Sequence, residues 1–359
     1  MKKIAVAGNA TLDVFVKEKA EVDSNKVTFT TIGGKLVEFY IVENPPILPG
    51  QKYRVNQNVA ADVRQLTHRY SPGGGGFNSI VGMRHLEEIG SLLELVYLDV
   101  SSPDSLIVDE LRNLGIDHRF FFQRDIPHNL ITVLRKKKLI LKGPHLGRVG
   151  PNERIIEQLE RVLSDADSLL INSIKDPRYY EHYIQIAEKN EVPVYAVVTA
   201  SVDRDFVFEY VIPRVRPIFN YDEIPLLVGE KSDLDEQSRL ELARETVTGI
   251  RRDGKNKVLP IFVTLGSHGA YVAKKNTVIH IKLKDAYAKR IDESLDETGD
   301  GLRGAGDVFS GAVTAYDTLA HHQENLQDLV RKASLAAIKH FGYLKHLPKS
   351  AFAYTEIPI

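Results

Sequence analysis

The residues with the clearest capacity for chemistry form the segment Gly304-Ala305-Gly306-Asp307, which opens a predicted helix over 304–319. The first three residues are small, so their backbone amides can point at one anion. The N-terminus of the helix adds a favourable positive potential there. The Asp307 carboxylate would lie beside that anion and could accept a proton from a hydroxyl attacking a bound phosphate. The simpler alternative is a glycine-rich helix start with a capping aspartate.

The elements that must position this segment follow a regular pattern from residue 151 onwards. Short strands alternate with helices, and the strands are almost continuously apolar. This favours a mostly parallel sheet with helices on both faces, whose ligands bind at the carboxyl ends of the strands. The expected strands are 168–172, 193–199, 217–220 and 258–265, and the expected helices are 151–163, 177–190, 221–228, 234–252, 304–319 and 326–341.

The N-terminal part of the chain has a different pattern. A buried strand is expected at 4–8, and the alternating runs 26–32 and 36–42 flank two glycines, which is typical of a β-hairpin. Further strand-like segments lie between 119 and 142. We therefore expect a small β appendage on the α/β body.

Composition narrows the classes of protein. The 47 basic and 48 acidic residues nearly balance, which argues against a basic nucleic-acid coat or a polybasic membrane anchor. The sequence has no cysteine, so disulfides, thiol catalysis and iron–sulfur clusters are excluded. No apolar run approaches the roughly 20 residues needed to span a bilayer. We expect a cytoplasmic protein with no nucleic-acid or membrane partner.

Five short motifs, in this order, resemble those of the ribokinase-like (PfkB) carbohydrate and nucleoside kinases. Each is weak alone, but together they span nearly the whole chain. They are GNATLD at 8–13, GGGGFN at 73–78, NYDE at 220–223, TLGSHG at 264–269 and GAGDVFSG at 304–311. The resemblance implies a single ribokinase-like kinase domain over 1–359, with a small β-sheet lid from about 14–70 and 118–143. It also implies transfer of the γ-phosphate of ATP, with Mg²⁺, to a hydroxyl of a small molecule.

The resemblance further implies a role for individual residues. Asp307 would be the general base, and the amides of Gly304, Ala305 and Gly306 would hold the developing charge. The substrate would be bound by Asp13, Gly74, Gly75 and Asn78. The nucleotide would be contacted by Asn220, Thr264, Gly266, Gly269 and Arg303. The metal ion would be held by Glu223 and Asn220.

The chemistry of several of these residues agrees with such roles. An ionised carboxylate such as Asp13 can accept hydrogen bonds from two sugar hydroxyls. Magnesium prefers carboxylates and keeps water ligands, so Glu223 could act through water. Each residue also has a structural alternative. Asp13 could be a turn residue, and Asn220 with Glu223 has the spacing of a helix capping box.

Two segments depart from the family pattern. The family usually has Asp and Thr before its glycine motif, where this chain has Gly301-Leu302-Arg303, so a requirement for a monovalent cation stays open. Arg303 could neutralise phosphate charge or lie on the surface. Residues 285–300 look like an insertion relative to the family pattern. The exposed strand edges of the lid would allow a homodimer.

The acceptor is not decided by these residues. A small sugar is our preferred acceptor, and a nucleoside is the alternative with the same chemistry. An alternative of another class is a non-catalytic ligand-binding or regulatory protein on a kinase fold. The presence of Asp307, Asn220 and Glu223 together favours an enzyme.

Overall fold

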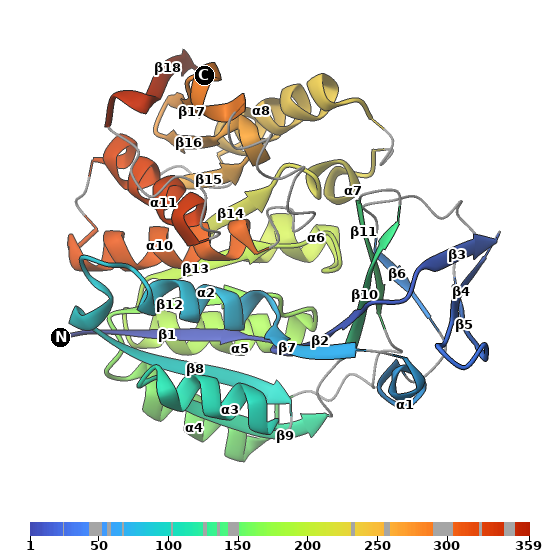
Figure 1. The fold of residues 1–359 in the computed structure, drawn as a ribbon. Helices are drawn as coiled ribbons and strands as arrows, with labels where there is room; N and C mark the ends of the chain where they lie inside the picture. Colours follow the sequence, from blue (N-terminus) through green and yellow to red (C-terminus); the bar gives the residue numbers. More distant parts are fainter. Residues whose placement is uncertain are drawn as a thin grey trace.

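The computed structural model describes the chain except residues 24, 43–51, 56–58, 67, 102, 125–127, 135–136, 143–150, 231–233, 255–258, 290–303, 323–324 and 341–348. Within the described ranges the strands form one large sheet and two small ones (Figure 1). None of the helices described is both long and apolar enough to cross a membrane.

The described part of the large sheet has ten strands. It is parallel from β15 to β9 and antiparallel at its other edge. In spatial order the strands are β18 (Phe352–Pro358), β17 (Thr277–Leu283), β16 (Ala270–Lys274), β15 (Ile261–Thr264), β14 (Arg216–Asn220), β13 (Val194–Val198), β12 (Ser168–Asn172), β1 (Lys2–Gly8), β8 (Leu93–Ser101) and β9 (Asp117–Arg124). Every residue of β12 is buried, as a strand covered on both faces requires.

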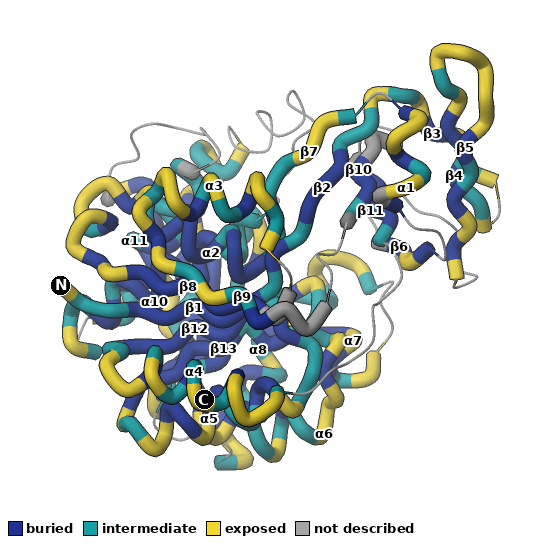
Figure 2. The backbone as a smooth tube through the Cα atoms, turned by 90° about the horizontal axis from the view of Figure 1, so that it is seen from below, coloured by how far each residue is buried: buried dark blue, intermediate teal, exposed yellow. Residues whose placement is uncertain are grey.

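Helices cover both faces of this sheet. Ile4 and Val6 of β1 pack toward one layer, and Ala5 and Ala7 pack toward the other, because successive side chains of a strand point to opposite faces. The first layer contains α2 (Gly75–Arg84), α3 (Ser105–Asn113), α10 (Ala305–Leu319) and α11 (Leu326–His340). The second contains α4 (Glu153–Leu163), α5 (Pro177–Lys189), α6 (Arg204–Phe206), α7 (Ile224–Val228) and α8 (Glu236–Arg252). Figure 2 shows the buried backbone concentrated along the central strands between the layers.

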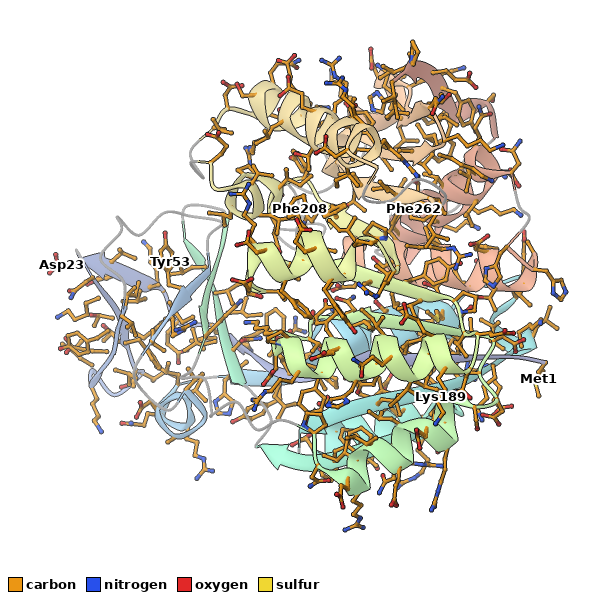
Figure 3. All side chains as sticks on the ribbon, turned by 180° about the vertical axis from the view of Figure 1, so that it is seen from behind. Met1, Asp23, Tyr53, Lys189, Phe208 and Phe262 are labelled. Carbon is orange, nitrogen blue, oxygen red and sulfur yellow. The ribbon has the colours of Figure 1, made fainter. Side chains whose placement is uncertain are left out.

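The two small sheets lie to one side of this body (Figure 1). The five-stranded sheet has the order β6 (Lys52–Arg54), β11 (Lys137–Lys142), β10 (His128–Leu134), β2 (Thr11–Val16) and β7 (His68–Gly73). The three-stranded sheet contains β3 (Ala20–Asp23), β4 (Lys26–Thr30) and β5 (Leu36–Tyr40). These sheets and the short helix α1 (Val59–Asp62) share a third apolar core, which includes Phe29, Phe39 and Tyr53. Figure 3 shows Tyr53 and Asp23 on this part of the molecule, away from Phe262 in the large sheet.

The expected architecture, a mostly parallel α/β sheet with helices on both faces and a smaller separate sheet, is confirmed. The hairpin expected around Gly33 and Gly34 is β4–β5. The lid was expected to include 118–143, whereas Asp117–Arg124 is β9, which pairs with β8 in the large sheet. Within 118–143, the described residues that contribute to the five-stranded sheet begin at His128. The C-terminal strand β18 was not expected.

Candidate active site

The carboxylate of Asp307 is held by two asparagine side chains from different elements. Asn78 in α2 donates from Nδ2 to Asp307 Oδ2 at 3.1 Å. Asn172, the last residue of β12, donates from Nδ2 to Asp307 Oδ1 at 3.0 Å. Ser79 donates from Oγ to the Asp307 carbonyl oxygen at 2.8 Å and itself accepts from Asn172 Nδ2 at 2.9 Å. One oxygen of the carboxylate is therefore fixed by each asparagine, and the group has a defined orientation at the start of α10.

The start of α10 depends on a glycine. Gly304 precedes the helix with φ of 77°, in the left-handed region that L-residues rarely adopt. A Cβ there would also lie 3.1 Å from Asn78 Nδ2. The amides of Ala305, Gly306 and Asp307 begin the helix, so they have no intrahelical acceptor and can serve an anion. The predicted anion site thus lies beside the Asp307 carboxylate.

The glycine run before α2 serves close packing. Gly74 has φ of 98°, and a Cβ there would lie 2.2 Å from the carbonyl oxygen of Asn9. A Cβ on Gly75 would lie 2.0 Å from Ser173 Oγ. The N-terminus of α2 therefore approaches the ends of β1 and β12 only because these residues lack side chains. This contact brings Asn78 to Asp307, and the substrate contacts expected of Gly74 and Gly75 stay predictions.

Asp13 lies in β2 and is only 5% exposed. Its Oδ1 accepts hydrogen bonds from Asn129 Nδ2 of β10 at 2.9 Å and from Thr11 Oγ1 at 3.2 Å. Gly73 of the neighbouring strand β7 packs directly against its Oδ2, where a Cβ would lie 2.2 Å away. The carboxylate is thus on the five-stranded sheet, close to where both connecting strands enter the α/β body.

The turn between β1 and β2, which carries the chain from the body to Asp13, is fixed by a buried carboxylate. Asp99, at the carboxyl end of β8, is fully buried. It accepts from the Ala10 amide at 2.6 Å and from the Tyr97 hydroxyl at 3.0 Å. These bonds tie the turn to the large sheet and so position the strand that bears Asp13.

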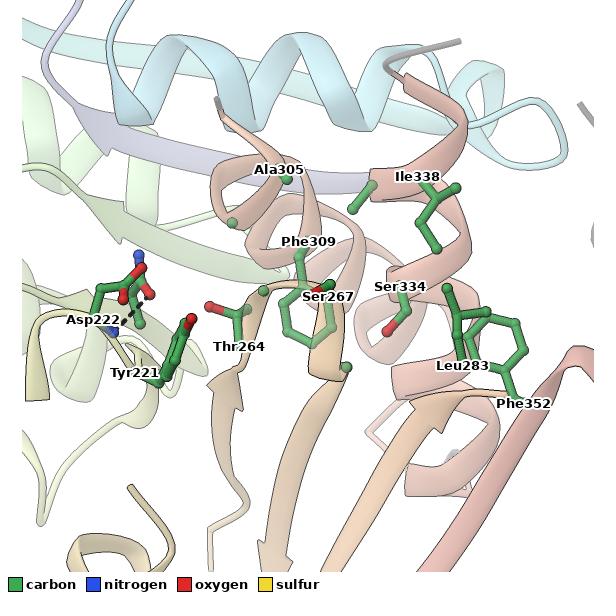
Figure 4. Close-up of a pocket in the computed structure, with 15 residues that line it drawn as sticks. Tyr221, Asp222, Thr264, Ser267, Leu283, Ala305, Phe309, Ser334, Ile338 and Phe352 are labelled. Carbon is green, nitrogen blue, oxygen red and sulfur yellow. Dashed lines mark hydrogen bonds between the residues drawn. The ribbon is translucent and has the colours of Figure 1, made fainter. Parts of the chain in front are cut away.

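A cavity of about 210 Å³ opens at the start of α10 (Figure 4). Its polar side includes Asn220, Thr264, Ala305 and Gly306. Gly266 and Gly269, in the turn between β15 and β16, line it as well. The other side is apolar and is formed by Leu283, Phe309, Ala337, Ile338 and Phe352. The four described residues that were expected to contact a nucleotide are therefore brought together around one cavity.

Asn220 and Glu223 do not form the capping box that their spacing would allow. Asn220 Oδ1 accepts from the Asp222 amide at 3.2 Å, a bond drawn in Figure 4. Glu223 Oε2 accepts from the Ala200 amide at 3.1 Å, which links the end of β13 to the start of α7. A carboxylate that is oriented by one oxygen can still offer the other oxygen to a water or a cation.

Most of the predicted site residues that the structure describes form two connected groups, while Asp13 lies on the five-stranded sheet. Asp307, Gly304 and Asn78 are in contact or adjacent, and the cavity residues adjoin them through Ala305 and Gly306. Glu223 is not among the residues that line the cavity. Arg303, with the altered segment 301–303 and most of the 285–300 insertion, lies outside the described residues.

Four residues of this region were not singled out from the sequence: Asn172, Ser79, Asn129 and Asp99. Asn172 and Asp99 had a usable signal, because each is a polar residue near the carboxyl end of a strand with many apolar residues. Asn129 had no such signal, since its contact with Asp13 depends on the parallel pairing of β10 with β2.

Comparisons with known proteins identify the fold. No protein-family model matches the chain, and no curated protein matches it by sequence. A ribokinase structure from Giardia lamblia is similar with a TM-score of 0.60 at 16% identity, covering 94% of this chain and 91% of that one. Arabidopsis thaliana ribokinase complexed with ribose and ATP gives 0.59 at 16% identity, covering 94% and 92%. A mutant of Escherichia coli phosphofructokinase-2 gives 0.51 at 16% identity, covering 94% and 99%. The ribokinase-like fold expected from the motifs is thereby confirmed.

Proposed function

We propose that this protein is an ATP-dependent phosphotransferase that moves the γ-phosphate to a hydroxyl group of a small sugar. The observation that carries the proposal is the position of the Asp307 carboxylate. It is held by two asparagines at the N-terminus of a helix, directly beside a cavity with one polar and one apolar side. The similarity to ribokinase structures, one of them with ribose and ATP, supports the same reading.

In the proposed reaction the sugar hydroxyl oxygen attacks the γ-phosphorus, and the bond between that phosphorus and the bridging oxygen of ADP breaks. Asp307 accepts the hydroxyl proton, which makes the oxygen a better nucleophile. The helix-start amides stabilise the charge on the transferring group, because they are already oriented before reaction. Asn78 and Asn172 keep the carboxylate aimed, and orientation is a large part of phosphoryl-transfer catalysis.

The cavity suits the nucleotide. A planar base would lie on the apolar side among Phe309, Leu283 and Phe352, and the phosphates would extend toward Ala305 and Gly306. Thr264 and Asn220 lie on the polar side, where a ribose or phosphate oxygen would be. Arg303 stays a predicted phosphate contact.

Magnesium is compatible with the residues present. Among the residues described, no group of three or more His, Asp or Glu side chains could hold a metal ion by itself. Mg²⁺ characteristically binds through one or two carboxylates, retained waters and substrate phosphates. Asn220, which lines the cavity, would supply a protein oxygen, and Glu223, which does not line it, would act through a retained water. When bound, the ion would neutralise charge on the nucleotide phosphates.

On the acceptor side, Asp13 and Asn129 would bind sugar hydroxyls, with Asn78 near the reacting group. The five-stranded sheet would act as a lid, since excluding water protects the γ-phosphate from hydrolysis. A single kinase domain over 1–359, a homodimer through the lid and a cytoplasmic location stay predictions of the sequence.

The test is ADP release from Mg-ATP with a panel of sugars, sugar phosphates, polyols and nucleosides. We expect at least one sugar to raise ADP release far above the acceptor-free rate, and Asp307→Asn, which keeps the shape of the side chain, to abolish that increase. Turnover with nucleosides only would assign the alternative acceptor. If every acceptor leaves the rate at background while ligands still raise the melting temperature, the protein is a binding protein and the proposal is wrong.

A further inference from the structure

The strand register places a row of polar residues across the five-stranded sheet. Asp13 pairs with Ser71 on one side and with Asn129 on the other. Asn129 pairs with Lys142, and Lys142 pairs with Arg54. Paired residues on neighbouring strands have their side chains on the same face, so all five residues share the face of Asp13.

The opposite face of this sheet is apolar and closed. The neighbours of the row, Val14, Leu130, Leu141 and Tyr53, form the alternate positions, and the first three are fully buried. They pack with the aromatic rings of the three-stranded sheet, including Phe29. In Figure 1 the five-stranded sheet stands between that small sheet and the α/β body. The polar row therefore lies on the side of the sheet that faces the body and the proposed active site.

Charge along the row is uneven. After the neutral Ser71, the row continues with the carboxylate of Asp13 and the amide of Asn129, and it ends with the two cations Lys142 and Arg54. Adjacent strands are about 4.8 Å apart, so the backbone of Lys142 is about 10 Å from that of Asp13 and that of Arg54 about 14 Å. Arg69, one row further out, adds a third cation, whose guanidinium lies 4.8 Å from the Phe15 ring centroid.

A sugar bound by its hydroxyls to Asp13 and Asn129 would thus extend along a row that becomes positively charged. Hydroxyl groups alone gain little from a lysine and an arginine side by side. A phosphate or carboxylate gains two charge-assisted hydrogen bonds there, and the arginine fork matches its geometry. The chain as a whole has a formal charge of −1, so this local excess of positive charge is not a general feature of its composition.

We propose that the acceptor is an anionic sugar, one that carries a phosphate or carboxylate at the end away from the attacking hydroxyl. Lys142 and Arg54 bind the anionic group, while Asp13 and Asn129 bind hydroxyls. This inference rests on the proposed phosphotransferase function and narrows its substrate class.

Binding is measured first, on the full chain and without catalysis. Three anionic compounds and three neutral ones are titrated by calorimetry: ribose 5-phosphate, fructose 6-phosphate and gluconate, and ribose, fructose and adenosine. Each is titrated into the wild type, Arg54→Gln, Lys142→Gln and Lys274→Gln. The last variant removes one positive charge from an exposed position at the end of β16, remote from the lid. We expect an anionic compound to bind, the two lid variants to weaken its binding about ten- to hundredfold, and the control to leave it unchanged. Binding of sugar phosphates or of gluconate alone would identify which anion is recognised.

Kinetics then separates the two proposals. We expect the lid variants to raise the KM of the anionic acceptor about ten- to hundredfold while kcat changes little, since neither residue is placed at the reacting atoms. Turnover of neutral sugars or nucleosides only would overturn the anionic acceptor and leave the phosphotransferase proposal standing. Charge-dependent binding without any turnover would overturn the phosphotransferase and keep the ligand class. If no anionic compound binds, or if Arg54→Gln and Lys142→Gln bind it as the wild type does, the inference is wrong.

Discussion

We call the two hydrogen bonds from Asn78 and Asn172 to the Asp307 carboxylate the two-asparagine clamp. Replacing the side-chain nitrogen of Asn172 with an oxygen tests this clamp. Asn172 is 1% exposed and donates from the same nitrogen to Asp307 Oδ1 at 3.0 Å and to Ser79 Oγ at 2.9 Å. Asn172→Asp keeps the size and shape of the side chain but replaces this donor with an oxygen. The variant therefore places two carboxylates in direct contact where the wild type has a hydrogen bond.

The size of the effect follows from these distances. Losing a hydrogen bond to a charged group costs about 1.5–3 kcal/mol, so Asn172→Ala should lower kcat at least tenfold. In Asn172→Asp, two unit charges about 3 Å apart would repel by roughly 5 kcal/mol at an effective dielectric constant of about 20. That repulsion exceeds the hydrogen-bond term, so the pair would retain a shared proton at neutral pH. A carboxylate that shares a proton is a poor base, and kcat should fall at least a hundredfold, a larger loss than in the alanine variant.

The assay is ADP release at saturating ATP and acceptor, from pH 6 to pH 10, together with thermal unfolding of each variant. We expect kcat of Asn172→Asp to recover in part as the pH rises and the shared proton is lost, while kcat of Asn172→Ala stays low throughout. The matched control is Asn152→Asp, the same chemical change at the N-cap of α4, where an aspartate caps as well. Wild-type kcat in Asn172→Asp, or equal and pH-independent losses in both Asn172 variants, would refute the clamp.

Three further predictions follow from single features of the site and the core. Gly304→Ala should lower kcat at least tenfold in steady-state assays, because φ of 77° strains any L-residue at the helix start. Phe352→Ala should raise the KM for ATP severalfold with little change in kcat, because this ring lines only the apolar side of the cavity. Burial acts to raise the pKa of Asp317, but hydrogen bonds from His322 and Tyr195 outweigh it and lower the pKa below the ordinary value. A carboxyl whose pKa is lower in the folded state than in the unfolded state stabilises the protein at pH values above its unfolded-state pKa. This stabilisation is lost as the pH falls through the folded-state pKa. Asp317→Asn should therefore reduce the free energy of unfolding in urea at pH 7, and this reduction should shrink progressively as the pH falls below the ordinary aspartate pKa.

The sequence was sufficient for the body of the fold because local pattern and burial agree there. The apolar run Ser168–Asn172 is β12 as predicted, and a strand with no polar alternation can only be covered on both faces. The helix predicted at 177–190 begins with Pro177 after the capping residue Asp176, signals that do not depend on the rest of the molecule. Asp307 lies in the first turn of α10, so its place at the N-terminus of that helix could be predicted from the sequence as well.

The rest of the site depends on contacts between distant segments. Asn129 and Asp13 are 116 positions apart, and their contact exists only because β10 adds to β2 in parallel register. A shift by one residue would turn Asn129 to the apolar face, and nothing local in 128–134 fixes that register. The packing role of the glycines at 74 and 75 also depends on distant segments, and their expected substrate contacts stay predictions. A side chain at Gly74 would meet Asn9 and one at Gly75 would meet Ser173, so these glycines let α2 pack against the ends of two strands.

The three-stranded sheet limits how a homodimer could form through the five-stranded sheet. An isolated five-stranded sheet has two faces to cover, and a partner subunit would be one way to bury the apolar face. Here Val14, Leu130 and Leu141 on that face are already fully buried beneath Phe29 and other residues of the same core. A second copy would gain no further hydrophobic burial at those positions. A homodimer through this sheet, still a prediction, would therefore have to form through strand edges. Pairing at the strand edges would leave the polar row on the other face open to the acceptor. The anionic-sugar proposal therefore holds for a monomer and for such a dimer alike.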